Sequence, residues 1–345
     1  MCYNNINRLF LSDTIRHILF CADYGDFVMK MKKLVPILAL VLGLSAFSGC
    51  TNTDQKIAFG EYWKLNALTP NDQFKENLVY DVAFEANATN ATDYTLDYKG
   101  TYSTNLATVI QNGETTYVYE TALAVTATYN FKGVKSEHQD VVLSKVQFRG
   151  ATGALEPIRS EKYVKSTSPT TGSHVNVTQC FQEFHYTVVN DYAAKTSVVT
   201  DCDKDGKALP ATAETKNFTF EDSDKYNVID NEQLFIALRA VPDTVTTGSL
   251  LCYSPFANLT QKIDFTFAAA EGAKLPFIDG AEKQINYRPV TITLDQKNPG
   301  TSQTAWIATM VNSHNNSNHN VLLRLETPIA YDLGTMVYSL KTASY

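Results

Sequence analysis

Three carboxylates stand at alternate positions in the segment Asp201-Cys202-Asp203-Lys204-Asp205-Gly206. This Asp-x-Asp-x-Asp-Gly spacing is typical of the start of a calcium loop, in which alternate carboxylates converge on one hard cation. The bidentate glutamate that completes such a loop is missing, because Thr212 occupies the twelfth position. We therefore favour a hairpin turn at residues 204–206 with solvated carboxylates. A Ca²⁺ site formed by Asp201, Asp203 and Asp205 is the alternative.

Cys180 and Cys202 are equally distant from Asp191 and lie in two runs with strand-like alternation. A three-residue hairpin loop at 190–192 would pair residues whose numbers sum to 382, which places the two thiols opposite one another. In an oxidising compartment they would form a disulfide worth ~2–4 kcal/mol. A one-residue bulge would instead leave two buried thiols. Cys252 has no partner in this scheme, and we predict that it is a small buried hydrophobic residue.

The segment before Cys50 has the three parts of an export signal. Lysines follow Met29, an apolar run extends from Leu34 to Leu44, and small residues precede Cys50. The apolar run is shorter than the roughly 20 residues that cross a bilayer. The closing Phe47-Ser48-Gly49-Cys50 resembles the lipobox of bacterial lipoproteins, although Phe47 stands where leucine is usual. The alternative is a plain secretory signal with an incidental cysteine.

The lipobox resemblance implies that the thiol of Cys50 receives a diacylglyceryl group and that fatty acyl chains such as palmitate hold the domain on a membrane. We then expect residues 1–28 to be a wrongly chosen start, 29–49 to be the signal peptide and 50–62 to be a tether. The protein would be exported and anchored on the outer face of the cytoplasmic membrane, or in the outer membrane of a Gram-negative cell.

The composition argues against nucleic acid as a partner. From Cys50 onwards the chain has 24 basic and 33 acidic residues, and its net charge is −9. Binding to phosphate backbones requires clustered cations. Because a chain this acidic repels nucleic acid, we expect no nucleic-acid partner. The expected partner is a membrane, through the acylated Cys50.

No catalytic constellation stands out in the sequence. The HExxH and GxSxG patterns and a phosphate-cradling glycine loop are all missing. Acidic groups that could serve a polymer hydrolase are Glu120, Glu137 with Asp140, and Glu221 with Asp222 and Asp224. Since solvated strand faces explain these residues better, we name no catalytic residue and no required cofactor, and we expect no enzyme activity.

Most of the chain after residue 75 reads as β-strands. Tyr, Thr, Val and Phe alternate with smaller or more polar residues, as in the run Leu78 to Phe84. The Asn112-Gly113 pair predicts a tight hairpin, and Lys132-Gly133 closes the next one. Strands are expected near residues 78–84, 94–102, 117–131, 139–149, 156–167, 175–189, 194–202, 213–220, 249–254, 260–268, 284–295, 303–310, 320–327 and 334–341.

One segment changes from strand to helix periodicity. Asp230 and Gln233 form a capping-box pattern before an apolar run that Pro242 ends. We predict a helix of about three turns over residues 230–241 that covers one face of the sheet.

The expected fold class is mainly β, with a large curved antiparallel sheet and one helix near 230–241. This helix separates a β-rich half at 63–229 from a second half at 230–345. A half-barrel and two β subdomains both fit this order. In either case we expect the two halves to pack as one unit.

Five stretches of the second half resemble segments of known protein families. They are residues 231–239, Tyr287-Arg288-Pro289-Val290, Ala305-Trp306-Ile307, residues 322–329 and residues 334–340. In this order the chain resembles uncharacterised exported β-domain families of bacteria, over roughly residues 76–343. Some of these families have a curved sheet similar to the half-barrel of the lipoprotein carriers LolA and LolB. The resemblance implies architecture and brings no binding or catalytic residue.

Tyrosines on the predicted strands are candidates for a ligand-binding face. They are Tyr80, Tyr98, Tyr102, Tyr117 and Tyr119. If one face of a curved sheet stays open, these rings would bind acyl chains, sterols or sugars. Packing against the helix explains the same residues and is the favoured interpretation.

Three functional hypotheses follow. The first is a non-catalytic binding or carrier lipoprotein for an apolar or amphipathic ligand, either a lipid or a glycan. The second is a structural or protein-interaction module of the cell envelope, and the third is a hydrolase of envelope polymers. A large apolar concavity favours the first, a filled sheet interface the second, and a cleft with two facing carboxylates the third.

Overall fold

The computed structural model describes residues 56–60, 63, 75–87, 94–111, 113–150, 153–169, 180–277, 281–294, 302–309, 320–329 and 333–344. The predicted start, signal peptide and Cys50 lie outside the described residues. Within the described ranges, no helix has both the length and the apolar character needed to cross a membrane.

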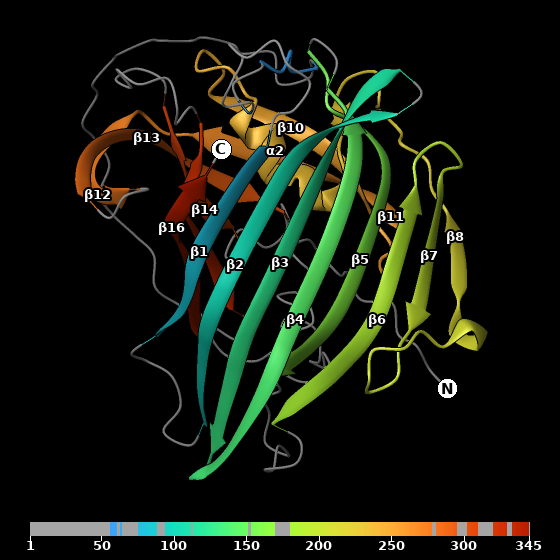
Figure 1. The fold of residues 1–345 in the computed structure, drawn as a ribbon, viewed down its shortest axis with the longest axis vertical. Helices are drawn as coiled ribbons and strands as arrows, with labels where there is room; N and C mark the ends of the chain where they lie inside the picture. Colours follow the sequence, from blue (N-terminus) through green and yellow to red (C-terminus); the bar gives the residue numbers. More distant parts are fainter. Residues whose placement is uncertain are drawn as a thin grey trace, which may run out of the picture.

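A single sheet of sixteen strands forms the fold (Figure 1). Its strands are β1 (Lys75–Ala86), β2 (Tyr94–Gln111), β3 (Glu114–Phe131), β4 (Val134–Arg149), β5 (Glu156–Pro169), β6 (Phe181–Asp191), β7 (Thr196–Asp201), β8 (Glu214–Asn217), β9 (Asn227–Val228), β10 (Thr247–Ser254), β11 (Leu259–Phe267), β12 (Glu271–Phe277), β13 (Ala281–Thr293), β14 (Gln303–Ala308), β15 (Leu322–Ile329) and β16 (Gly334–Ser344).

The strand order is β8-β7-β6-β5-β4-β3-β2-β1-β16-β15-β14-β13-β11-β10-β9, and β12 pairs with β13. Strand β1 pairs antiparallel with β16, so the sheet runs without interruption through both halves of the chain. Only the short pair of β9 and β10 is parallel among the described strands. The predicted fold class, a large curved antiparallel sheet, is confirmed.

Tight turns align the longest strands. Gln111 pairs with Glu114 across a two-residue connection, as the Asn-Gly pattern predicts. Lys132 and Gly133 both have positive φ, which is the geometry of a type I′ hairpin turn. These turns keep β2, β3 and β4 in register over their whole length, and the three form the long wall in Figure 1.

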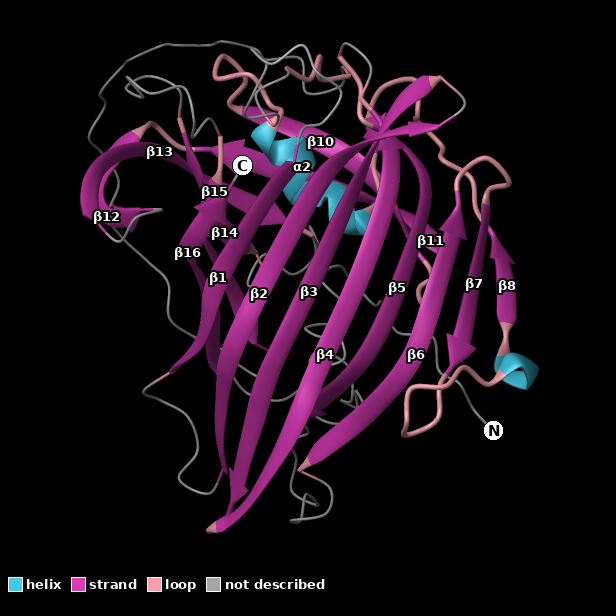
Figure 2. Cartoon of the chain, in the orientation of Figure 1, coloured by secondary structure: helices cyan, strands magenta, loops and turns pink. Residues whose placement is uncertain are grey.

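The helix lies where the sequence predicts it but is shorter. A 3-10 turn, η2 (Asn231–Gln233), leads into α2 (Leu234–Arg239). The capping box is confirmed, because Asp230 accepts from the backbone N–H of Glu232 and the Gln233 side chain accepts from the N–H of Asp230. Figure 2 shows α2 behind the upper part of the long strands.

The inner face of the curved sheet is packed. All α2 residues except Phe235 are buried, and the apolar ones share one core with inward residues of β1 to β7, β10, β11 and β13 to β16. Since strand side chains alternate between faces, the other face of β2 to β6 is left to solvent. The sheet therefore has a closed inner side and an open outer side along these strands.

A buried ion pair joins α2 to the sheet. The Arg239 guanidinium donates to both carboxylate oxygens of Glu76, at 2.8 and 2.7 Å, and to the carbonyl of Trp63. Burial disfavours the charged guanidinium, but the charge and hydrogen bonds of Glu76 raise the pKa of Arg239 overall. Both side chains are at most 2% exposed.

The predicted disulfide register is wrong. Strands β6 and β7 are joined by four residues, because the Asp191 side chain accepts from the N–H of Ala194 and Lys195 takes a positive φ. Cys202 therefore lies beside His185, and Cys180 lies five residues farther along, roughly 17 Å away at strand spacing. The two buried sulfur atoms are not bonded to one another.

Strand β12 was not expected from the sequence. Its residues Glu271–Phe277 include Gly272, Lys274 and Pro276, which weaken the alternation typical of strands. It forms because β13 is long enough to pair with β11 and β14 at one end and with β12 at the other.

Removing one member of the buried ion pair should destabilise the protein strongly. Arg239→Met leaves an uncompensated Glu76 carboxylate in the core and should lower the free energy of unfolding by ~3–5 kcal/mol. The double variant Glu76→Leu/Arg239→Met should be more stable than Arg239→Met alone. Urea unfolding of the variants measures this coupling.

The exposed Lys135–Glu137 pair provides the control, since both side chains are more than half exposed. Glu137→Gln should leave the free energy of unfolding nearly unchanged, because exposed ion pairs contribute little to stability. If the losses of unfolding free energy in Glu76→Leu and Arg239→Met simply add up in the double variant, the two buried residues are not coupled.

Candidate functional site

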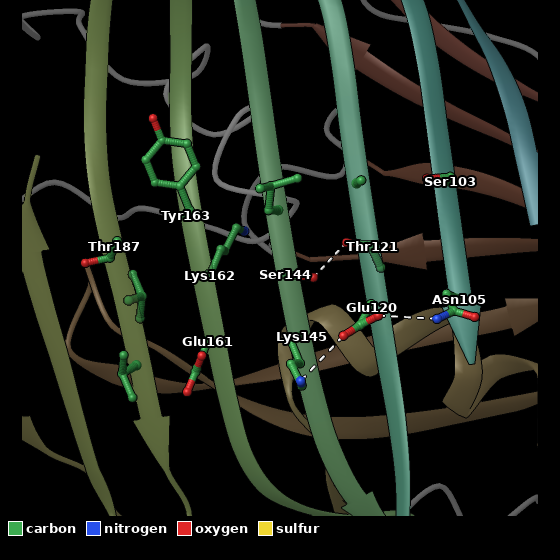
Figure 3. A pocket seen from close by; sticks show the side chains of 14 residues that line it. Ser103, Asn105, Glu120, Thr121, Ser144, Lys145, Glu161, Lys162, Tyr163 and Thr187 are labelled. Atoms are coloured by element: carbon green, nitrogen blue, oxygen red, sulfur yellow. Dashed lines mark hydrogen bonds and ion pairs between the residues drawn. The ribbon is translucent and has the colours of Figure 1, made fainter. Parts of the chain in front are cut away.

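A trough lies on the outer face of β2 to β6, with a volume of about 610 Å³ (Figure 3). Strand register builds it from two rows of outward side chains that cross the sheet. The first row is Asn105, Glu120, Lys145, Glu161 and Val189. The second row is Ser103, Ala122, Leu143, Tyr163 and Thr187.

The hollow results from differences in side-chain size. Ser103 and Ala122 are small and stand beside the larger Leu143 and Tyr163 in the same row. Leu143 is 47% exposed, which is high for a leucine within a central strand. The floor of the trough is therefore partly apolar and accessible to a ligand.

The first row carries charges that are paired with one another. The Asn105 amide donates to Glu120 at 3.3 Å, and the Lys145 ammonium lies 3.5 Å from the same carboxylate. Figure 3 shows Glu120 between these two side chains and Glu161 on the far side of Lys145. Glu161 in turn accepts from Arg159 at 3.0 Å. The row offers donors and acceptors without a large net charge.

The acidic loop after β7 borders this trough. The Asp203 carboxylate accepts from the backbone N–H groups of Asp205 and Lys207, and Gly206 has φ +82°. A Cβ at Gly206 would lie 2.7 Å from the Tyr163 hydroxyl, so the loop backbone contacts this ring. The structure thus uses Asp203 to close a turn beside Tyr163.

The predicted calcium ligands do not converge. No group of three or more His, Cys, Asp or Glu side chains that could hold a metal ion occurs within the described ranges. The turn uses Oδ1 of Asp203 to accept from two backbone N–H groups, and Asp201, Asp203 and Asp205 do not form such a group.

The predicted ligand-face tyrosines lie together on the inner face. Tyr80, Tyr98, Tyr117 and Tyr119 are at most 8% exposed. Tyr80 donates to the carbonyl of Leu322 across the core, at 2.9 Å. These rings therefore pack the core, which agrees with the interpretation that the sequence favoured.

Tyr102 differs because it is only half buried and lines a crevice beside α2. The crevice holds about 50 Å³ and lies between β2 to β4 on one side and β14 to β16 on the other. Burial raises the pKa of Tyr102 well above its usual value, and neighbouring Tyr119 and Glu232 raise it further. This space accommodates one or two water molecules.

A second polar cluster surrounds Asp140 on the inner face. Asp140 is 1% exposed and accepts from the Thr167 hydroxyl at 2.9 Å, and Thr167 accepts from Tyr129 at 3.0 Å. Burial raises the pKa of Asp140 to about 7, and the hydrogen bonds from the Thr167 backbone and from the Thr167 and Ser166 hydroxyl groups offset only part of this effect. No ion pair of Asp140 is found within the described ranges.

The acidic pairs considered for catalysis do not form a facing pair. Glu137 is exposed and bound to Lys135, whereas Asp140 is buried on the opposite face of β4. Asp222 pairs with Lys225 in an exposed turn. Glu120 and Glu161 do share the trough, but Lys145 stands between them in register.

Comparisons with family models and with curated proteins find no match for this sequence. Among solved structures, the chain is similar to a β-barrel-like protein of the domain of unknown function DUF1849 from Brucella abortus. The two chains are 9% identical, the alignment covers 78% of this chain and 97% of that chain, and the TM-score is 0.43. So distant a likeness carries no functional argument.

Most trough residues were not singled out from the sequence. Glu120 was noted only as an acidic residue, while Leu143, Lys145, Glu161 and Tyr163 look like ordinary exposed strand positions. Their proximity depends on the register of five strands. Leu143 directly follows Val141 and Val142, so the sequence does not mark it as exposed.

Asp140 should make the stability of the protein depend on pH. The folded chain holds the proton up to about pH 7, whereas the unfolded carboxyl has the ordinary value of 3.8. The stability that the protonated Asp140 contributes is therefore fully present below about pH 4 and is lost as the pH rises towards and through 7. Asp140→Asn should remove this fall and melt at a higher temperature than the native chain at pH 8.

Melting temperatures measured from pH 4 to pH 8 test this expectation. Glu137→Gln is the matched control, because Glu137 is exposed on the same strand and should leave the fall in place. An Asp140→Asn profile parallel to the native one would show that Asp140 does not cause the dependence.

Proposed function

We propose that the protein is a non-catalytic binding protein of the bacterial cell envelope, anchored through Cys50, whose outer trough takes a neutral glycan. The observation that carries this proposal is the position of the trough of about 610 Å³. It lies on the outer face of β2 to β6, where the floor is partly apolar and the rim carries hydrogen-bonding groups.

The chemistry of the trough suits a saccharide. Sugars present C–H faces that pack on apolar and aromatic side chains, and the trough offers Leu143 and Tyr163 for this contact. The hydroxyl groups of a sugar need both hydrogen-bond donors and acceptors, which Asn105, Glu120 and Lys145 supply. A purely apolar ligand would desolvate these charges without replacing their hydrogen bonds, at a cost in free energy.

The charge balance argues for a neutral ligand. Glu120 and Glu161 are each in contact with a cation, so neither the carboxylates nor Lys145 present an unopposed charge. A hydrolytic mechanism would need a carboxyl in an apolar environment to act as the acid. Both carboxylates here are exposed to solvent, so binding without catalysis is the better supported function.

Neutral oligosaccharides test the proposal directly. Isothermal titration with oligomers of N-acetylglucosamine and of glucose should reveal binding by the native protein. Tyr163→Ala should weaken binding about tenfold or more, which corresponds to ~1.4 kcal/mol of lost contact. Ala122→Trp should abolish binding, because an outward indole fills the trough and removes no polar group.

Glu137→Gln is the control, since Glu137 is exposed on the outer face outside the trough. It should bind as the native protein does. Binding that survives Ala122→Trp would place the ligand elsewhere, and the absence of binding to either class of oligomer would contradict a site for neutral glycans.

A carrier for an apolar ligand is the second candidate, favoured by the crevice beside α2 and the aromatic inner face. The crevice of about 50 Å³ is far smaller than the 300–1,000 Å³ of ordinary ligand sites. Native mass spectrometry of the protein from a bacterial host should therefore find no lipid bound non-covalently. A co-purifying lipid would favour the carrier over the glycan-binding function.

A further inference from the structure

The two rows that line the trough differ in chemistry over its three central strands (Figure 3). The first row has charged side chains on β3, β4 and β5, and the second row has Ala122, Leu143 and Tyr163 on the same strands. The rows stand two residues apart on each strand, about 6.7 Å. A ligand in the trough therefore meets hydrogen-bonding groups along one edge and a largely apolar surface along the other.

The length of the trough is set by the number of strands that it crosses. All of its lining residues lie on β2 to β6, and each of these strands contributes one side chain to each row. Because neighbouring strands are about 4.8 Å apart, the contacts repeat at this interval and the five strands span about 19 Å.

This repeat restricts the shape of a glycan that can use every strand. In an extended β-1,4-linked chain of hexoses, each unit advances the chain by a length close to the strand spacing, and the chain is a flat ribbon. Its ring faces carry C–H groups and its edges carry hydroxyl groups, so an edge can follow the first row while a face packs on the second row. An α-1,4-linked chain coils, and its successive units turn away from both rows.

We propose that the trough binds a linear β-1,4-linked glycan that lies across β2 to β6, with about four units in contact, one for each interval between neighbouring strands. This proposal rests on the glycan-binding function proposed above and names the linkage and the length of the ligand. The central units lie over Leu143 and Tyr163, and the terminal unit on the β2 side reaches Asn105. The backbone at Gly206 lies against the Tyr163 hydroxyl group and supports the ring in this place.

Isothermal titration of the full-length protein with oligomers of two to six units tests linkage and length separately. The ligands are β-1,4-linked oligomers of glucose and of N-acetylglucosamine, and α-1,4-linked oligomers of glucose. For at least one β-1,4-linked series, the affinity should rise about tenfold or more from two to four units and change less than about twofold from five to six. The α-1,4-linked tetramer should bind at least about tenfold more weakly than the tighter of the two β-1,4-linked tetramers.

The possible outcomes separate this proposal from the glycan-binding function. Equal affinities of the α- and β-linked glucose tetramers would overturn the linkage while leaving the function in place. An affinity that does not depend on length would overturn the placement across the strands. Binding of the N-acetylglucosamine series alone, with the same rise to four units, would support the proposal. If no series binds, the glycan-binding function itself is contradicted.

Asn105→Ala tests where the ligand ends. Asn105 is the first-row contact on β2, so its loss should weaken the tetramer about as much as the removal of one unit does. The dimer should be unaffected, since it binds over Leu143 and Tyr163. Gln139→Ala is the matched control, because Gln139 is an exposed amide on the outer face of β4 outside the trough. An equal loss for dimer and tetramer, in a variant that melts as the native chain does, would contradict this placement.

Discussion

The architecture depends on the buried pair of Arg239 and Glu76. These residues are 163 positions apart, and their contact fixes the end of α2 against the start of β1. The same arginine binds the carbonyl of Trp63, and its own carbonyl accepts from Asn320. Four distant segments therefore meet at this one arginine, two of them through its guanidinium and one through its backbone carbonyl. Because desolvation offsets much of the attraction within such a pair, its main contribution is to give α2 one defined position.

That position decides which face of the sheet remains available. With α2 fixed, its apolar residues fill the concave side of the sheet. The inward tyrosines therefore pack in the core and are not available to a ligand. Among the described residues, a crevice of about 50 Å³ beside Tyr102 lies on this side. The outer face of β2 to β6 has no such cover, and its accessible volume lies over Leu143 and Tyr163. Because the interior is filled, binding at the outer surface is better supported than the carrying of an apolar ligand inside the sheet.

Local patterns in the sequence predicted the elements well. Alternation located the long strands, the Asn112-Gly113 pair fixed one hairpin, and the capping box at Asp230 and Gln233 marked the helix start. These predictions are correct because each of these features is determined by a few neighbouring residues. The pairing of Cys180 with Cys202 failed because the turn lies at residues 192–195 and not at 190–192, which shifts the register by five residues. The trough could not be predicted, since it needs the correct register of five strands at once.

The placement of the trough has a further structural consequence. Strands β2 to β6 are each paired on both sides, so their backbone groups cannot bind a partner strand, and recognition must come from side chains. The row from Asn105 to Glu161 crosses the strands at right angles to their length. For a glycan in the trough, this row favours an elongated ligand that lies across the strands over one that approaches end-on.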